Sequence, residues 1–278
     1  MRFTVLASGS IGNASLVQNG VSAILLDIGL GPRQLASRLA TAGASWRDVH
    51  AVILTHVHGD HWHHRTLLHL AQRAIPLWCH AHHRAWLRRH VAEFAEVETA
   101  GLVRCYDPAK VWSPVSGLRV RALPVRHDGG PTFGFRLEGT PGLFGQRPAL
   151  AYVADLGCWT YDLAQALANV DLLALEFNHD VALEQGSGRS ARLIARILSD
   201  DGHLSNEQAA ALLAEVVRRS TPGRLKYVVQ LHLSSQCNRA SLARGLAQAV
   251  LGRGPEAPQL HTAGQHAPTP TFDVTARP

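Results

Sequence analysis

Residues 51–61 read Ala51-Val52-Ile53-Leu54-Thr55-His56-Val57-His58-Gly59-Asp60-His61. The first four residues form an apolar run, which predicts a buried strand. Directly after this run, three imidazoles and one carboxylate fall within six positions, 56 to 61. These side chains are common ligands of zinc and of its first-row neighbours. The stretch therefore predicts a metal site at the end of a strand.

The spacing of this motif allows two metal ions. Alternate residues just beyond a strand point to similar sides. His56 can then pair with His58 on one ion, and Asp60 with His61 on a second ion about 3.5–4 Å away. Each ion still needs further ligands. Three other apolar strands end in a polar residue of a suitable type, namely His127, Asp155 and His232.

Strand ends at one edge of a sheet are where α/β folds place their sites. We expect His127 and His232 to supply one ligand each, and Asp155 to bridge the two ions. Taken singly, each of these three residues can also be an ordinary polar residue at a strand end. The motif at 56–61 is what favours a ligand role for them.

Apolar periodicity predicts strands and helices that alternate along the chain. The expected strands include 3–7, 51–55, 118–124, 132–137, 149–154, 172–177 and 226–231, and the expected helices include 82–94, 205–219 and 239–251. This alternation indicates the α/β class. No linker divides the chain, so we expect one domain over residues 1–251. Residues 252–278 are rich in Pro, Ala and Thr, and we expect a disordered tail.

The composition fits an ordinary globular protein. Of the 278 residues, 46% are hydrophobic, the net charge is +6, and the four cysteines form no CxxC pair. The N-terminus lacks the features of a signal peptide, and no apolar run approaches the roughly 20 residues of a membrane span. We therefore expect a cytoplasmic protein without a disulfide framework.

Residues Thr55–His61 resemble the HxHxDH signature of the metallo-β-lactamase fold. The resemblance implies a four-layered αββα sandwich with a dinuclear metal site on one edge. It also implies a ligand set. His56, His58 and His127 would bind one metal, Asp60, His61 and His232 the other, and Asp155 would lie between them. Zinc is the expected metal, and manganese would also fit the carboxylate-containing site.

Shorter stretches are similar to the YycJ (WalJ) subgroup of this superfamily. They are Leu6–Ser10 with Gly12–Ala14, Glu176–Asp180, Gly202–Asn206 and His232–Ser234. Members of the subgroup are regarded as DNA exonucleases linked to repair. The resemblance therefore implies a phosphodiesterase or 5′-exonuclease that acts on nucleic acid.

His203 lies just before a helix that Ser205 caps, with Gln208 three residues further on. Backbone N–H groups at a helix N-terminus favour an anion. We expect His203, Ser205 and Asn206 to bind a substrate phosphate, and His203 to protonate the leaving group. The alternative is a histidine that only caps its own helix turn.

A second polar segment ends the strand at 172–177. We expect Glu176, Asn178 and His179 to orient ligand histidines from behind, and hydrogen bonding within the loop is the alternative.

The expected reaction is hydrolysis by a hydroxide that bridges the two metal ions, with Asp60 and His203 as the catalytic residues. Three alternatives remain open. One is a cyclic or small-molecule phosphodiesterase, and another is a hydrolase of a lactone, thioester or other ester. The third is a non-catalytic nucleic-acid-binding protein. The expected partner is nucleic acid or another phosphodiester rather than a membrane, and the sequence leaves the oligomeric state open.

Overall fold

A computed structural model describes residues 1–142 and 145–275 of the chain. The described residues build two mixed sheets. The strand order of the first sheet is β14 (Phe272–Asp273), β1 (Arg2–Ala7), β2 (Ala14–Asn19), β3 (Ser22–Leu26), β4 (Val49–Ile53), β5 (Leu77–His80) and β6 (Val103–Tyr106). The strand order of the second sheet is β13 (Gln259–Thr262), β12 (Tyr227–Leu231), β11 (Leu172–Glu176), β10 (Ala149–Val153), β9 (Thr132–Glu138), β8 (Leu118–Val125) and β7 (Val111–Val115).

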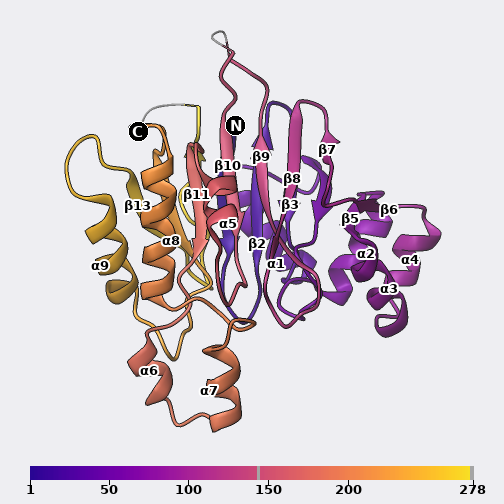
Figure 1. The fold of residues 1–278 in the computed structure, drawn as a ribbon. Coiled ribbons are helices and arrows are strands. Elements are labelled where there is room, and N and C mark those ends of the chain that lie inside the picture. Colours follow the sequence, from indigo (N-terminus) through magenta and orange to yellow (C-terminus); the bar gives the residue numbers. More distant parts are fainter. Residues whose placement is uncertain (143–144, 276–278) are drawn as a thin grey trace.

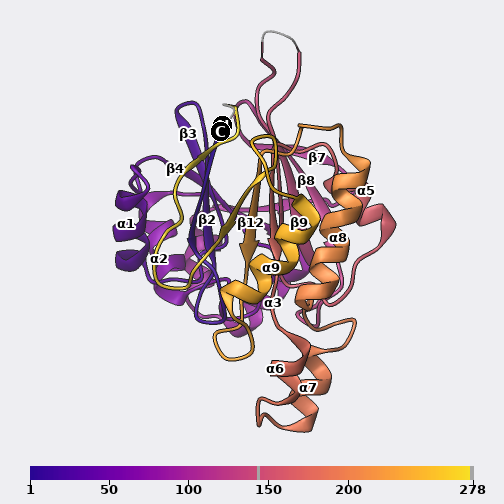
Figure 2. The ribbon, with the colours of Figure 1, turned by 90° about the vertical axis from the view of Figure 1, so that its left-hand side faces the viewer.

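Helices cover the outer face of each sheet (Figure 2). The helices α1 (Pro32–Thr41), α2 (His64–Arg73), α3 (Ala81–His90) and α4 (Phe94–Thr99) pack on the first sheet. The helices α5 (Tyr161–Leu167), α8 (Asn206–Arg219) and α9 (Ala240–Leu251) pack on the second sheet. A third apolar layer lies between the two sheets. The expected α/β class and the αββα sandwich are therefore confirmed.

Strand β4 shows why residues 51–54 are an unbroken apolar run. Val52 packs against the helices, whereas Ala51 and Ile53 pack between the two sheets. Successive side chains of a strand point to opposite faces. Both faces are buried at residues 51–53, so neither can be polar there, whereas His50 near the start of β4 is exposed. The next polar residue, Thr55, follows where the strand leaves the core.

Two short helices project away from the sandwich. Helix α6 (Val181–Gln185) and helix α7 (Ala191–Ile197) lie below the ends of α8 and α9 in Figure 1. They follow β11 and lead back to the segment that carries His203. One predicted helix is divided, because the helix expected over 82–94 ends at His90 and α4 begins at Phe94. Val91 between them has an extended backbone.

The expectation of a disordered tail from residue 252 does not hold for the described residues 252–275. Strand β13 pairs in parallel with β12, and β14 pairs antiparallel with β1. Gln265 also bonds the loop after β1, because its Nε2 donates to the Gly12 carbonyl (2.9 Å) and its Oε1 accepts from the Ile11 N–H (3.0 Å). Pairing with the edge strands β1 and β12 orders the segment, so its own sequence does not need an apolar periodicity.

Candidate metal centre

The site lies where several strands of both sheets end. The motif at 56–61 follows β4, His127 follows β8, Asp155 follows β10, and His232 follows β12. Asp155 and His232 have left-handed backbones, with φ of 58° and 54°, and Asp27 after β3 has φ of 59°. This conformation is uncommon for residues other than glycine and often marks functional sites. The predicted convergence of strand ends is what the structure shows.

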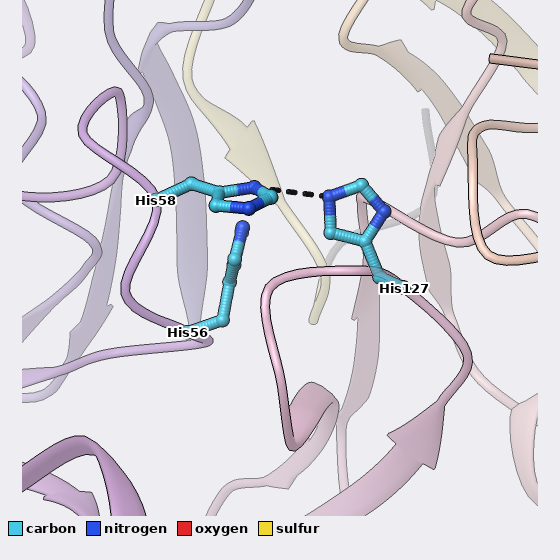
Figure 3. A group of neighbouring side chains, drawn as sticks. All are labelled: His56, His58 and His127. Atoms are coloured by element: carbon cyan, nitrogen blue, oxygen red, sulfur yellow. Dashed lines mark hydrogen bonds between the residues drawn. The ribbon is translucent and has the colours of Figure 1, made fainter. Parts of the chain in front are cut away.

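The first cluster contains His56, His58 and His127 (Figure 3). One ligand atom from each lies within 4.8 Å of the others. Nδ1 of His58 is 3.1 Å from Nε2 of His127. Nδ1 of His127 bonds the Gly202 carbonyl at 2.8 Å, which fixes the ring and leaves Nε2 on the side of the cluster.

His56 tests whether this cluster suits a metal ion. Its Nδ1 lies 2.9 Å from the hydroxyl of Thr55. Its Nε2 is buried and has no hydrogen-bond partner among the described residues. Buried polar atoms almost always have a partner. Burial, reinforced by the neighbouring His61, holds the pKa of His56 well below its ordinary value, so the ring is neutral. A neutral imidazole with a free, buried nitrogen fits a metal ion.

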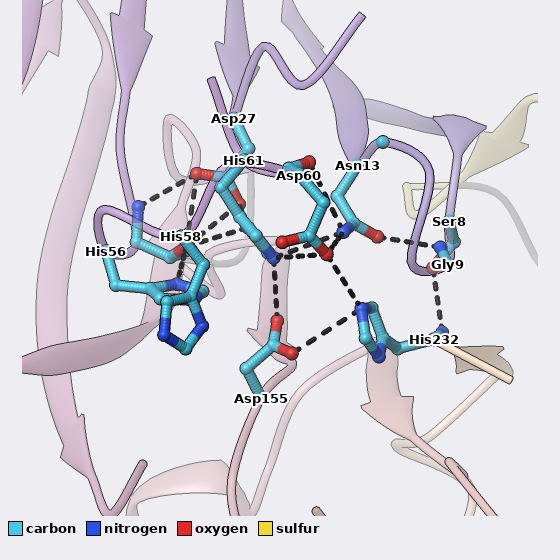
Figure 4. Close-up of polar contacts among 12 residues, drawn as sticks. Ser8, Gly9, Asn13, Asp27, His56, His58, Asp60, His61, Asp155 and His232 are labelled. Atoms are coloured by element: carbon cyan, nitrogen blue, oxygen red, sulfur yellow. Dashed lines mark hydrogen bonds and ion pairs between the residues drawn. The ribbon is translucent and has the colours of Figure 1, made fainter. Parts of the chain in front are cut away.

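The second cluster contains Asp60, His61 and His232. Nε2 of His232 is 3.2 Å from Oδ2 of Asp60, and Nε2 of His61 is 3.6 Å from the same oxygen. Asp155 lies between the two clusters (Figure 4). Its Oδ2 is 2.9 Å from Nε2 of His61, and its Oδ1 is 3.5 Å from Nε2 of His232. Asp155 also forms a potential ligand group with His56 and His61.

The charges in this second cluster are concentrated and buried. Burial opposes protonation of His61, but nearby carboxylates, led by Asp27, outweigh it and hold its pKa well above the ordinary value. Burial likewise opposes ionisation of Asp155, but His232 and His61 outweigh it and hold the carboxyl pKa well below the ordinary value. In the bare chain, protons on histidines supply the positive charge that these carboxylates need. A divalent cation would supply the same charge.

Four further side chains support the clusters, and the sequence did not single out any of them as site residues. They are Ser8, Asn13, Asp27 and Thr55. Oδ2 of Asp27 lies 2.7 Å from Nδ1 of His61. The amide of Asn13 donates to Oδ2 of Asp60 at 3.0 Å, and the Ser8 hydroxyl accepts from the N–H of His232 at 2.8 Å. Asp27 could have been identified as a candidate from the sequence, because it follows an apolar strand as His127 and Asp155 do.

His203 lies next to the clusters, as predicted. Its ring stacks on that of His232, with centroids 5.3 Å apart. Its Nδ1 is 2.7 Å from Oε1 of Glu176, which is fully buried. The other oxygen of Glu176 accepts from the Leu156 N–H at 2.9 Å. Glu176 therefore orients His203. Asp155, Glu176, His203 and His232 also form a fourth group that could hold a metal.

The remaining predicted residues have mixed outcomes. Asn178 lies 3.0 Å from Nδ1 of His232 and donates to its carbonyl at 2.8 Å, so it holds this histidine as expected. His179 is buried, but its ring nitrogens make no hydrogen bond to the described residues, so it bonds no ligand histidine.

Ser205 and Asn206, the other residues expected to bind phosphate, make hydrogen bonds within the protein. The Ser205 hydroxyl accepts from the N–H of Gln208, and the buried amide of Asn206 bonds Asn238. The Asn206 N–H donates to the His179 carbonyl at 2.8 Å. The Asn206 donors are therefore engaged within the protein, which a capping pattern in a sequence does not reveal.

A cavity of about 400 Å³ opens beside the clusters. Its lining includes the site residues His58, Asp60, Asp155, Asn178, His203 and His232. Ser10 and Ser234 add hydroxyl groups. Arg189 comes from the loop between the two projecting helices, and Leu193, Arg196 and Ile197 come from α7. A substrate in this cavity would lie against the clusters and His203 together.

An αββα sandwich with histidine and carboxylate clusters at one edge is the architecture of a metal-dependent hydrolase. A family model described as a β-lactamase superfamily domain matches residues 22–223, and the chain belongs to this family. None of the described helices is both long and apolar enough to cross a membrane.

Curated relatives agree with the subgroup resemblance. The chain is 29% identical over 259 residues to "Exodeoxyribonuclease WalJ" of Streptococcus pneumoniae, covering 91% of each chain. It is 27% identical over 275 residues to "Exodeoxyribonuclease YycJ" of Bacillus anthracis, covering 97% of each chain.

Solved structures share the fold. Zn²⁺-bound PqqB from Methylobacterium extorquens superposes with a TM-score of 0.69 at 18% identity, over 98% of this chain and 100% of that chain. The short form of human tRNase Z superposes with a TM-score of 0.62 at 16% identity, over 99% of each chain. The family match and the curated relatives, together with this fold, identify the chain as a metal-dependent hydrolase of the metallo-β-lactamase fold.

Proposed function

We propose that this hydrolase is a phosphodiesterase with two divalent metal ions, and that it acts as an exonuclease on DNA. The observation that carries the proposal is the position of His203 beside the clusters, with the buried Glu176 behind it. Hydrolysis of a phosphodiester expels an alkoxide, which needs a proton. The full-length similarity to two proteins named exodeoxyribonucleases supports DNA as the substrate.

Two sets of residues would hold the ions. His56, His58 and His127 would bind one, Asp60, His61 and His232 the other, and Asp155 would contact both. When bound, such ions supply a nucleophile from water at neutral pH and offset charge on the phosphoryl oxygens. Zinc is the expected metal because most of the ligands are imidazoles, and manganese is compatible with the carboxylates.

The residues of the chain supply the remaining steps. Glu176 holds Nδ1 of His203, so Nε2 is the nitrogen that can give a proton to the leaving oxygen. Asn178 contacts the ring and the carbonyl of His232, and the Ser8 hydroxyl accepts from its backbone N–H. Asn13 holds the Asp60 carboxylate. These contacts keep the ligands in one arrangement before substrate binds.

The test uses purified protein loaded with zinc or manganese. Its substrates are 5′-phosphorylated single- and double-stranded DNA, RNA, a bis-aryl phosphodiester, a lactone and a thioester. We expect DNA to be hydrolysed fastest and Asp60→Ala to be inactive. Faster hydrolysis of the lactone or thioester than of the phosphodiesters would overturn the proposal that the protein is a phosphodiesterase. Metal content below one ion per chain, or substantial activity of Asp60→Ala with one ion bound, would overturn the two-metal site.

A further inference from the structure

The hairpin formed by α6 and α7, residues 181–197, forms one side of the cavity. Arg189, Leu193, Arg196 and Ile197 line it from this hairpin, and the clusters line it from the strand ends. Figures 1 and 2 show the hairpin extending beyond the sandwich, away from the helices that cover the sheets. The hairpin therefore adds a wall to the site that the two sheets do not provide.

Arg189 is held rigidly within this wall. Its Nη1 bonds both carboxylate oxygens of Glu184, at 3.2 and 3.0 Å, and its Nε bonds Oε1 of Gln236 at 3.1 Å. The Glu184 side chain is fully buried. Nη2 of Arg189 makes no hydrogen bond to the described part of the chain. The guanidinium is thus fixed in place, and its Nη2 can donate hydrogen bonds to a ligand.

Arg196 is held by Asp128, which lies beside the first cluster. Its Nε and Nη2 bond the two carboxylate oxygens of Asp128. Oδ1 of Asp128 in turn lies 3.6 Å from Nε2 of both His58 and His127. Nη1 of Arg196 has no hydrogen-bond partner in residues 1–142 and 145–275. A second guanidinium with spare donors therefore lies one residue away from the first metal cluster.

Two apolar side chains accompany these arginines. Leu193 and Ile197 are four residues apart on α7 and so lie on one face of the helix, together with Arg196. Both line the cavity, and Ile197 is 7% exposed. The wall thus combines fixed cations with an apolar surface. Grooves that hold single-stranded nucleic acid pair basic groups for the phosphates with apolar or aromatic groups for the bases.

We propose that Arg189 and Arg196 bind phosphate groups that flank the scissile phosphodiester of a nucleic-acid strand. Leu193 and Ile197 lie against a base of the same strand. This inference rests on the proposed function and narrows its substrate class. A lactone, a thioester or a cyclic nucleotide has no flanking phosphate for two arginines to bind. A strand with several phosphates uses the metal site and both guanidinium groups together.

Binding gives the first test. The probe is a 3′-fluorescein single-stranded DNA with phosphorothioate linkages, added to the metal-loaded protein and followed by fluorescence anisotropy. We expect Arg189→Gln and Arg196→Gln each to raise the Kd by about tenfold to a hundredfold, because each removes a charge-assisted hydrogen bond. The slope of log Kd against log salt should fall by about 0.7 for each arginine. Arg192→Gln is the matched control, since Arg192 is an exposed residue of α7 outside the cavity lining.

Arg189→Gln leaves a buried carboxylate without its cation, which can disturb the hairpin. The pair Glu184→Gln and Glu184→Gln/Arg189→Gln avoids this, because both variants lack the buried charge and only one lacks the arginine. Weaker DNA binding in the double variant than in Glu184→Gln assigns the effect to Arg189. Equal binding by these two variants would overturn the role of Arg189.

Kinetics give the second test. We expect the arginine variants to lose at least about ten times more kcat/KM on an oligonucleotide than on a bis-aryl phosphodiester, mainly through KM. Equal losses of kcat/KM on the two substrates would overturn the inference, and so would wild-type Kd values for DNA in both variants. Neither result would contradict the proposal that the protein is a phosphodiesterase. Arginine-dependent DNA binding without hydrolysis of any phosphodiester would overturn the proposed function and leave the inference standing.

Discussion

Nδ1 of His61 lies 2.7 Å from Oδ2 of Asp27, and both side chains are fully buried. Asp27 also accepts hydrogen bonds from the backbone N–H of Thr55, at 2.9 Å, and from its hydroxyl. One carboxylate at the end of β3 therefore fixes both the start of the motif after β4 and its last histidine. A ligand oriented in this way donates its remaining proton to the carboxylate and keeps Nε2 for the metal.

Asp27→Asn should weaken metal binding by about tenfold to a hundredfold, because it removes the charge that fixes the tautomer of His61. Competition against a fluorescent chelator measures the affinity. Asp48→Asn, at an exposed position just before β4, controls for the loss of a carboxylate. Unchanged affinity in Asp27→Asn would show that the pair serves folding alone.

His203→Gln should lower kcat on DNA by about 10²- to 10⁴-fold, the usual contribution of a general acid. The loss should shrink to less than about tenfold on bis-p-nitrophenyl phosphate, because p-nitrophenolate leaves without a proton. Steady-state rates on both substrates decide the matter. A loss of the same size on both, together with lower metal content, would instead make His203 a metal ligand.

His83 should make the fold less stable in acid. It is fully buried, its Nε2–H donates to the Pro131 carbonyl at 2.6 Å, and its Nδ1 accepts from the N–H of His80. Burial lowers its pKa to about 4. The unfolded chain takes up this proton first, so between about pH 6.5 and pH 4 the free energy of unfolding falls as pH falls.

Urea titrations at several pH values measure this dependence. As pH falls through that window, the free energy of unfolding of the wild type should decrease more steeply than that of His83→Gln, by up to about 1.4 kcal/mol per pH unit. His90→Gln removes an exposed histidine from the same helix and is the control. Parallel pH profiles for the wild type and His83→Gln would contradict the prediction.

Cys105 should be the cysteine that alkylates fastest. It is exposed and lies opposite the buried Cys79 in the register of β5 and β6. A hydrogen bond from the Cys79 thiol, aided by Arg84, lowers the pKa of Cys105 to about 6. Iodoacetamide at pH 7 followed by peptide mass spectrometry should find Cys105 modified before Cys158, whose pKa burial raises. Arg84→Gln should slow the reaction, and equal rates at the two cysteines would contradict the prediction.

The candidate ligand residues could be predicted from the sequence because their signal is local. His56 to His61 follow an unbroken apolar run, and His127, Asp155 and His232 each end a strand. The supporting residues were missed for the opposite reason. Ser8 and Asn13 lie in stretches that resemble the subgroup, and Asp27 follows an apolar strand, but only the fold shows which candidate ligand each one contacts. Ser205 caps α8 as the pattern predicts, but the sequence does not show that Asn206 next to it bonds Asn238.

Two larger features also lay beyond local patterns. The strands β13 and β14 are short and follow a stretch rich in proline and alanine, so their order depends on edges that distant strands provide. The arginines of the α6–α7 hairpin give no motif, because their role depends on the cavity that they line.

The pairing of β14 with β1 and the bonds from Gln265 to the loop after β1 tie an edge of the first sheet to the surroundings of the clusters. Without β14, β1 would be an open edge that can pair with other chains. The same loop carries Asn13, which holds the Asp60 carboxylate. Proteolytic removal of this segment would therefore both expose an edge that favours aggregation and loosen the loop beside the clusters.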